Sequence, residues 1–221
     1  MITWNCNGAF RKKFQYLDSF DADIYIIQEC EDPARSNHDS YIKFAENHLW
    51  IGHNKNRGLG IFAKKEIKLE DNNWPSFGLE YFICCKINNT FDLLGIWGCN
   101  NYIEDIYVYL QIYKKQIRNT LIGGDFNSNA IWDEKHKRRT HSGVVDELAS
   151  IGLVSTYHSL TDTVAGSEKY ATYYMYRHSH RPYHIDYFFC KREWVDNLTI
   201  GSYKDWILHS DHMPIFLEIN S

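Results

Sequence analysis

Short apolar runs separated by turn residues follow one another along most of this chain. The run Ile24-Tyr25-Ile26-Ile27 is apolar at every position, which is typical of a central strand covered on both faces. Comparable runs predict strands at 2–5, 24–29, 49–52, 59–63, 80–87, 91–97, 121–122, 153–156, 170–175, 185–190, 197–201 and 214–219. The pattern therefore indicates a protein with many strands.

Three other segments have the spacing of amphipathic helices. Apolar residues three and four positions apart predict one helix directly after the first strand, with Phe10, Phe14, Leu17 and Phe20 on its buried face. A helix of about four turns is predicted over 103–117. A third is expected near 143–151, with Ser142 as its cap and Gly152 after its end. Together these elements predict an α/β fold of two sheets with helices outside.

Length and composition favour one domain over the whole chain, residues 1–221. With 44% apolar residues and only four prolines, the sequence contains no low-complexity tract that suggests a linker. No apolar run reaches the roughly 18 residues of a membrane span, and the first residues do not resemble an export signal. Six scattered cysteines suit buried free thiols. We therefore expect a cytoplasmic protein with no membrane contact, and we predict no protein partner.

Polar side chains stand at the ends of several predicted strands. We expect the strand at 121–122 to stop at Gly123 and Gly124, so that Asp125 and Asn127 share one side while Phe126 packs on the other. Strand ends gather at one edge of a packed sheet, so such groups can converge. The full set is Asn5, Glu29, Asp125, Asn127, Asp186, Asp211 and His212. Oxygen ligands with one imidazole suit Mg²⁺ or Mn²⁺ better than Zn²⁺.

Five of these motifs resemble one known family in their order and spacing. They are Trp4-Asn5, Gln28-Glu29, Gly124-Asp125-Phe126-Asn127, Ile185-Asp186-Tyr187 and Ser210-Asp211-His212-Met213-Pro214. Together they resemble the endonuclease/exonuclease/phosphatase superfamily, whose members have the DNase I-like fold. The resemblance implies a four-layer α/β sandwich, with two mixed central sheets flanked by helices, that hydrolyses phosphate esters with a divalent cation.

The resemblance also implies a role for each matching residue. Glu29 would be the principal metal ligand, and Asn5 and Asp211 would complete or adjust that site. Asp125 would orient or deprotonate the attacking water, and Asn127 would hold that water or a phosphate oxygen. His212 would bind the phosphoryl oxygen, with Asp186 hydrogen-bonded to its ring. A phosphodiester gains negative charge as water attacks, so a cation, neutral or positive donors and one base suit this reaction.

Two positions depart from the family pattern. Asn7 stands where many nucleases of the family have aspartate, and Trp97 stands where they have a phosphate-binding tyrosine or histidine. An indole donates one hydrogen bond but does not ionise. Asn100 or Asn101 is a candidate for the lost donor, and the alternative for Trp97 is a place in the core.

Aromatic, histidine and basic residues leave further alternatives open. Tyr174 or Tyr176 is a candidate substrate contact, although tyrosine-rich strands are common in cores. A zinc site at the histidines of residues 178–184 matches no standard spacing. The net charge of −4 argues against a general polycation, but basic residues gather at 11–13, 135–139 and 177–181. Arg138 and Arg139 are therefore predicted to contact a polyanionic substrate.

The first hypothesis is a Mg²⁺- or Mn²⁺-dependent phosphodiesterase acting on nucleic acid, most simply a DNA endonuclease or exonuclease. The main alternative is a phosphatase or phosphodiesterase acting on a small or lipid-linked phosphate ester, as inositol phosphatases do. A second alternative is a binding module that kept the fold without catalysis. The complete set of predicted catalytic and metal-binding residues counts against this second alternative.

Overall fold

Two six-stranded sheets face each other in the computed structural model, which describes residues 1–220. In spatial order, the first sheet, sheet A, contains β13 (Val195–Ile200), β14 (Ile215–Ile219), β1 (Ile2–Asn5), β2 (Ile24–Cys30), β4 (Arg57–Ala63) and β3 (His48–Asn54). Strand β1 runs parallel to β2 and antiparallel to β14. The first and last strands of the fold are thus neighbours at the centre of sheet A.

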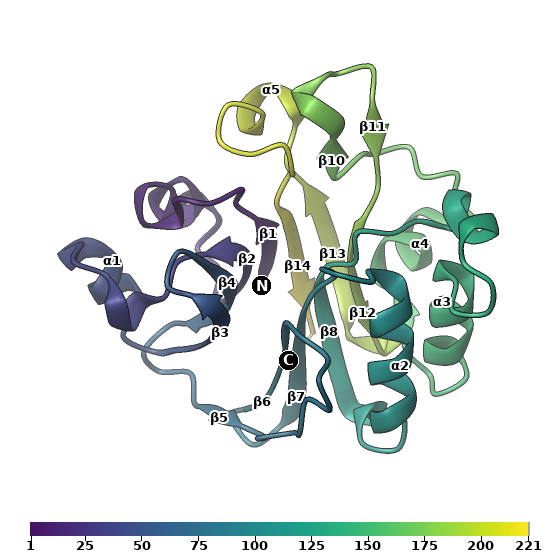
Figure 1. The fold of residues 1–221 in the computed structure, drawn as a ribbon, viewed down its shortest axis with the longest axis horizontal. Helices are drawn as coiled ribbons and strands as arrows, with labels where there is room; N and C mark the ends of the chain where they lie inside the picture. Colours follow the sequence, from purple (N-terminus) through teal and green to yellow (C-terminus); the bar gives the residue numbers. More distant parts are fainter. Residues whose placement is uncertain (221) are drawn as a thin grey trace.

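The second sheet, sheet B, has the same number of strands and is also mixed. In spatial order it contains β5 (Leu69–Asp71), β6 (Phe82–Ile87), β7 (Phe91–Trp97), β8 (Thr120–Asp125), β12 (Asp186–Cys190) and β9 (Val154–Ser155). Strand β8 is parallel to β7 and antiparallel to β12. A short hairpin of β10 (Tyr173–Tyr174) and β11 (Pro182–Tyr183) stands at one end of the sandwich, beside α5 (Tyr203–Trp206), at the top of Figure 1.

Helices cover the outer faces of both sheets (Figure 1). The other α-helices are α1 (Asp39–Phe44), α2 (Ile103–Tyr113), α3 (His141–Ala149) and α4 (Thr156–Thr161). Short 3₁₀ helices are η1 (Phe10–Lys12), η2 (Phe14–Phe20), η3 (Pro33–Arg35), η4 (Ile117–Asn119), η5 (Ala130–Lys135), η6 (Met175–Arg177) and η7 (Arg192–Trp194). Among residues 1–220, no helix has both the length and the apolar composition that crossing a membrane requires.

Three apolar clusters connect these layers. One lies between the sheets and joins Ile26 and Ile61 of sheet A to Leu121 and Phe188 of sheet B. A second joins sheet B to α2 and α3, and a third joins sheet A to η1, η2 and α1. The order helix, sheet, sheet, helix confirms the predicted four-layer α/β sandwich. The cysteines are unpaired and five of the six are buried, as the sequence suggested.

Several element boundaries differ from the prediction for local reasons. The segment after β1 is not a continuous α-helix, because Lys13 leaves helical geometry between η1 and η2. Its apolar side chains Phe10, Phe14 and Leu17 are nevertheless buried, as their spacing predicted. Thr140, not Ser142, caps α3, since the Thr140 hydroxyl accepts from the Gly143 amide at 2.9 Å.

Strand lengths also differ. The strand predicted over 170–175 is reduced to the two residues of β10. The strand predicted at 121–122 does not stop at the glycines, because β8 continues through Gly123 and Gly124 and ends at Asp125. At Gly124 a Cβ atom would lie 1.9 Å from the carbonyl oxygen of Ile96, so only glycine lets β8 approach β7 so closely.

Candidate active site

The two sheets bring five separate segments to one edge of the sandwich. Strand β1 ends at Asn5, beside Gln28 near the end of β2. Strand β8 ends at Asp125, whose direct partner across the sheet is Asp186, the first residue of β12. The loop before β14 carries Asp211 and His212 to the same edge. Its position is fixed in part by the Trp4 indole, which donates to the His212 carbonyl at 2.9 Å.

Asp125, Asp186 and His212 form a buried cluster, with one ligand atom of each within 4.8 Å of the others. His212 Nδ1 lies 3.0 and 3.1 Å from the two carboxylate oxygens of Asp186. Burial lowers the pKa of His212, but the carboxylates of Asp186 and Asp125 raise it more, to about 10. The ring is therefore protonated at neutral pH, and its Nε2 is left to donate to another group.

The surroundings of Asp125 favour its neutral form, whereas those of His212 favour its charged form. Burial and the nearby Asp186 carboxylate raise its pKa to about 7. The backbone N–H of Asn127 donates to Asp125 Oδ1 at 2.8 Å, and Asn5 Nδ2 donates to Asp125 Oδ2 at 3.0 Å. A carboxylate with a pKa near neutrality is suited to accept a proton from water.

Asn5 connects this cluster to Glu29. Besides its bond to Asp125, Asn5 Nδ2 lies 3.3 Å from Glu29 Oε1, and Asn5 Oδ1 accepts from the backbone N–H of Asn7 at 3.0 Å. Asn7 Nδ2 in turn donates to Asp211 Oδ1 at 2.6 Å. One chain of hydrogen bonds therefore runs from Asp125 through Asn5 and Asn7 to Asp211.

Glu29 is placed by an irregularity in β2. The pairing of β2 with β4 shifts register between Gln28 and Cys30, which makes Glu29 a bulged residue, and its φ is +62°. Bulges redirect side chains at sheet edges. Asn7 and Asn127 also have positive φ values, +52° and +47°. Left-handed backbone at non-glycine residues is costly, and here it occurs at three residues of one site.

The remaining predicted residues lie at different distances from this site. Trp97 is opposite Asp125 in the pairing of β7 with β8, and only 5% of it is exposed. Asn100 turns away and donates to Glu80 at 2.7 Å. The Tyr174 amide donates to the Asp211 carbonyl at 2.8 Å, while its ring packs on Tyr203.

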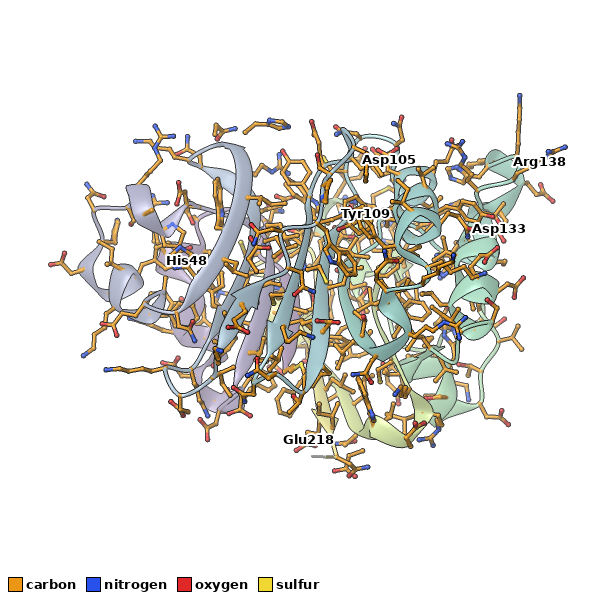
Figure 2. The ribbon with its side chains drawn as sticks, turned by 90° about the horizontal axis from the view of Figure 1, so that it is seen from below. His48, Asp105, Tyr109, Asp133, Arg138 and Glu218 are labelled. Carbon is orange, nitrogen blue, oxygen red and sulfur yellow. The ribbon has the colours of Figure 1, made fainter. Side chains whose placement is uncertain are left out.

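Arg138 and Arg139 are also outside the hydrogen-bonded site. They lie in the segment between η5 and α3, where they line a surface hollow of 430 Å³ with Lys135, Lys137 and Glu104. Figure 2 shows Arg138 at the outer rim of the molecule. Because η5 begins three residues after Asn127, this basic segment is nevertheless connected to the site by one short helix.

Sequence reasoning missed other residues of the site. The centroid of the Tyr173 ring lies 4.6 Å from that of the His212 ring, which places Tyr173 at the site as well as the predicted Tyr174. The Thr172 hydroxyl accepts from the amide of Asp186 at 3.0 Å. Arg57 forms an ion pair with Glu29. Alternation along 172–174 could have separated the two tyrosines, but nothing in the sequence links Arg57 to Glu29.

The oxygen atoms of the site are the kind of donor that a divalent cation requires. Glu29 and Asp211 each offer carboxylate oxygens, and the asparagines that connect them offer amide oxygens. Such hard oxygen donors fit Mg²⁺ or Mn²⁺. The Asp125, Asp186 and His212 group is a poorer fit, because a protonated imidazole has no lone pair for a metal.

Comparisons with solved structures support the same fold. The 3′ phosphatase NExo from Neisseria, bound to a product DNA hairpin, matches with a TM-score of 0.74 at 15% identity, over 100% of this chain and 98% of that chain. An AP endonuclease from Archaeoglobus fulgidus matches with a TM-score of 0.69 at 16% identity, over 100% and 98% of the two chains. At these identities the likeness concerns the fold alone.

Comparison with sequence families goes further than fold. A search among curated proteins finds no match. The model of the "Endonuclease/Exonuclease/phosphatase family" matches residues 2–212. Because this match spans nearly the whole chain, the chain belongs to the endonuclease/exonuclease/phosphatase family.

Proposed function

We propose that this protein hydrolyses phosphodiester bonds of nucleic acid, most simply DNA, with the help of bound Mg²⁺ or Mn²⁺. The observation that supports the proposal most directly is the role of Asn5, which bridges Asp125 and Glu29. An acid with a pKa of about 7 is thereby held next to a carboxylate that suits a cation. Hydrolysis of a phosphodiester needs both groups within reach of one phosphorus atom.

The proposed mechanism assigns each step to a residue of the site. Asp125 accepts the proton of the attacking water, and Asn127 helps to hold that water. His212, kept protonated by Asp186, donates from Nε2 to a phosphoryl oxygen, where charge accumulates as the water attacks. Glu29, Asn5 and Asp211 would hold the cation, which supplies charge stabilisation for the departing oxygen.

Basic residues near the site favour a nucleic-acid substrate. Arg177 and Arg181 belong to the β10–β11 hairpin, which also carries Tyr173 against His212. The segment 135–139 contributes further exposed cations after η5. Phosphate contacts of this kind supply much of the affinity for nucleic acids and carry no sequence preference by themselves. The DNA-processing relatives named above agree with this substrate class.

A cleavage panel tests the proposal. Single- and double-stranded DNA, duplex with an abasic site, RNA and a soluble inositol polyphosphate are incubated with Mg²⁺ or Mn²⁺, with and without chelator. We expect cleavage of at least one nucleic acid that chelator abolishes and that falls at least about 100-fold in Glu29→Gln. Phosphate release from the inositol compound alone would replace nucleic acid by a small ester as the substrate. Full activity in Glu29→Gln would overturn the assignment of the site.

A further inference from the structure

Glu29 is paired with a cation of the protein itself. Arg57 Nη2 lies 2.5 Å from Glu29 Oε1, and 13% of the Glu29 side chain is exposed against 56% of the Arg57 side chain. Arg57 is the first residue of β4, next to the bulge in β2 that carries Glu29. Among residues 1–220, no other lysine, arginine or histidine forms an ion pair with Glu29. Arg57 therefore occupies the carboxylate that the proposed function assigns to the metal ion.

Arg57 has a second partner in Trp97. Its guanidinium lies over the indole, 5.4 Å from the ring centroid, and the indole is fixed by burial and by the Tyr81 ring at 4.5 Å. Arginine stacks well on aromatic faces, and this attraction comes from the ring and not from the carboxylate. The guanidinium thus has a contact with the Trp97 ring that does not depend on Glu29.

The asparagines near Trp97 are engaged elsewhere. The Asn100 amide donates to Glu80 at 2.7 Å, and the Asn101 amide donates to Asp105 at 3.1 Å. Neither is therefore directed at the space between Trp97 and Glu29. The donor that does lie there is the guanidinium, which offers a planar fork suited to phosphate oxygens.

A dication and a guanidinium compete for the same Glu29 oxygen. Binding of the dication removes the attraction that holds Arg57 on Glu29 and adds repulsion between two positive groups. The released guanidinium remains over Trp97 at the edge of the site, with its donors unpaired. A phosphate that approaches the site is the matching anion.

We propose that Arg57 is an exchangeable counter-ion: it binds Glu29 while the metal is absent, and it binds a substrate phosphate once the metal holds Glu29. This inference rests on the proposed function for the role of Glu29. Trp97 stands where many nucleases of the family have a phosphate-binding tyrosine or histidine, and an indole does not ionise. The proposal assigns this phosphate contact to Arg57 instead. Metal binding and substrate binding would then support each other. The metal ion takes Glu29 from Arg57 and so frees the guanidinium for phosphate, and a bound phosphate draws Arg57 away and so frees Glu29 for the metal ion.

Titration with Mn²⁺ in the absence of substrate tests the first half of the proposal. Arg57→Ala should bind Mn²⁺ about fivefold more tightly than the wild type, since the competing cation is gone. Lys55→Ala is the matched control, because it removes one positive charge from the same exposed β3–β4 turn. Its affinity should stay within about twofold of the wild type. An Arg57→Ala affinity equal to or weaker than that of Lys55→Ala would overturn the proposal.

Steady-state kinetics at saturating metal test the second half. With the best oligonucleotide of the cleavage panel, Arg57→Ala should raise KM about tenfold, because one charge-assisted phosphate contact is lost. Arg57→Lys should recover only part of this loss, since lysine lacks the planar fork. A KM in Arg57→Ala that matches that of Lys55→Ala would overturn the phosphate contact.

The two halves separate this inference from the proposed function. The Mn²⁺ titration needs no substrate, so it decides the counter-ion exchange even if the wild type cleaves no nucleic acid. Absence of all cleavage by the wild type would overturn the proposed function. Circular dichroism spectra of the variants should match that of the wild type, because the Arg57 side chain is more than half exposed and only its outer contact with the Trp97 ring is lost.

Discussion

The protein contains two buried carboxylate–imidazole pairs that look alike and differ in their surroundings. Asp186 and His212 meet at 3.0 Å in the candidate active site. Glu168 and His158 also meet at 3.0 Å, behind β12, where α4 packs. All four side chains are largely buried. The chemistry of the pair itself therefore does not distinguish an active site from a structural contact.

The neighbours of each pair make the difference. Glu168 accepts hydrogen bonds from His158, the Gly166 amide and Asn129, and although burial raises its pKa, these bonds lower it to about 2. His158 is also held on its other nitrogen by Ser155 at 2.7 Å. This pair is saturated, because every donor and acceptor that it offers already has a partner within the fold.

The Asp186–His212 pair is instead left unbalanced by Asp125. Two carboxylates share one imidazolium, so one negative charge and one N–H remain for other partners. Unbalanced buried groups are costly for stability and are a mark of functional sites. The comparison indicates that the candidate active site is marked by the additional carboxylate of Asp125 beside the pair, and not by the presence of a carboxylate–imidazole pair.

The largest expected effect concerns the saturated pair. His158→Ala should lower the free energy of unfolding by about 3 kcal/mol, because it leaves the buried Glu168 carboxylate without one of its hydrogen-bond donors. Urea denaturation at pH 7 measures the loss, and His180→Ala, at an exposed histidine, should change stability by less than about 0.5 kcal/mol. If folded His158→Ala lost cleavage as severely as a variant of His212, the distinction between the two pairs would be wrong.

The next effect concerns the unbalanced pair. His212→Ala should reduce kcat at least about 100-fold, because it removes the donor to the phosphoryl oxygen. The measurement uses the substrate that the wild type cleaves best, under saturating Mg²⁺ or Mn²⁺. Retention of more than a tenth of the wild-type kcat would show that the pair has no catalytic role.

A smaller effect is expected from His141, which packs on Tyr187 at 4.9 Å beside the saturated pair. Neither of its ring nitrogens has a hydrogen-bond partner among residues 1–220, and burial lowers its pKa from 6.5 to about 4. The unfolded chain therefore gains a proton below pH 6.5 that the folded chain does not take up until about pH 4. Stability from this residue is present above pH 6.5 and is lost as the pH falls.

Between pH 7 and pH 5 the contribution of His141 to this loss should be about 2 kcal/mol. His141→Leu removes the titrating group, so its free energy of unfolding relative to the wild type should rise by about 2 kcal/mol from pH 7 to pH 5, measured by urea denaturation at several pH values. Glu168 loses its contribution mainly below its unfolded pKa of 4.5. The raised pKa values of Asp125 and His212 act in the opposite direction between pH 7 and pH 5, but both groups are present in the variant and the wild type and cancel in the difference. An unchanged slope in His141→Leu would assign the acid sensitivity to other groups, such as His184.

The fold, and the convergence of the polar strand-end residues at one edge, could be predicted from the sequence because both depend on local patterns. Apolar runs located the central strands, and the polar residues at their ends followed from strand ends sharing one edge. Contacts that depend on a single residue of register, such as that of Tyr173 with His212, were outside the prediction. Tyr173 and Tyr174 are adjacent and chemically identical, and only the two-residue strand β10 determines which ring meets His212.

Long-range electrostatic contacts were not predictable in this way. In the sequence, Arg57 follows Lys55 and Asn56 and looks like part of any exposed basic turn, whereas in the structure it begins β4, and its pairing with Glu29 depends on the bulge in β2. The split of residues 10–20 into two 3₁₀ helices also left no sequence signal, because 3₁₀ and α-helices can bury the same apolar face. Backbone geometry of this kind is decided by the packing of the whole sandwich.

The left-handed backbone of Glu29 bears on how such a chain changes over generations. Glycine has no Cβ and would occupy position 29 with less strain, so selection for stability alone would favour it there. Under the proposed function, the contribution of this carboxylate to the reaction compensates for the strain. If selection for the proposed function were relaxed, replacement of Glu29 by glycine would be favoured, so the identity of this residue in a descendant would indicate whether that function is retained.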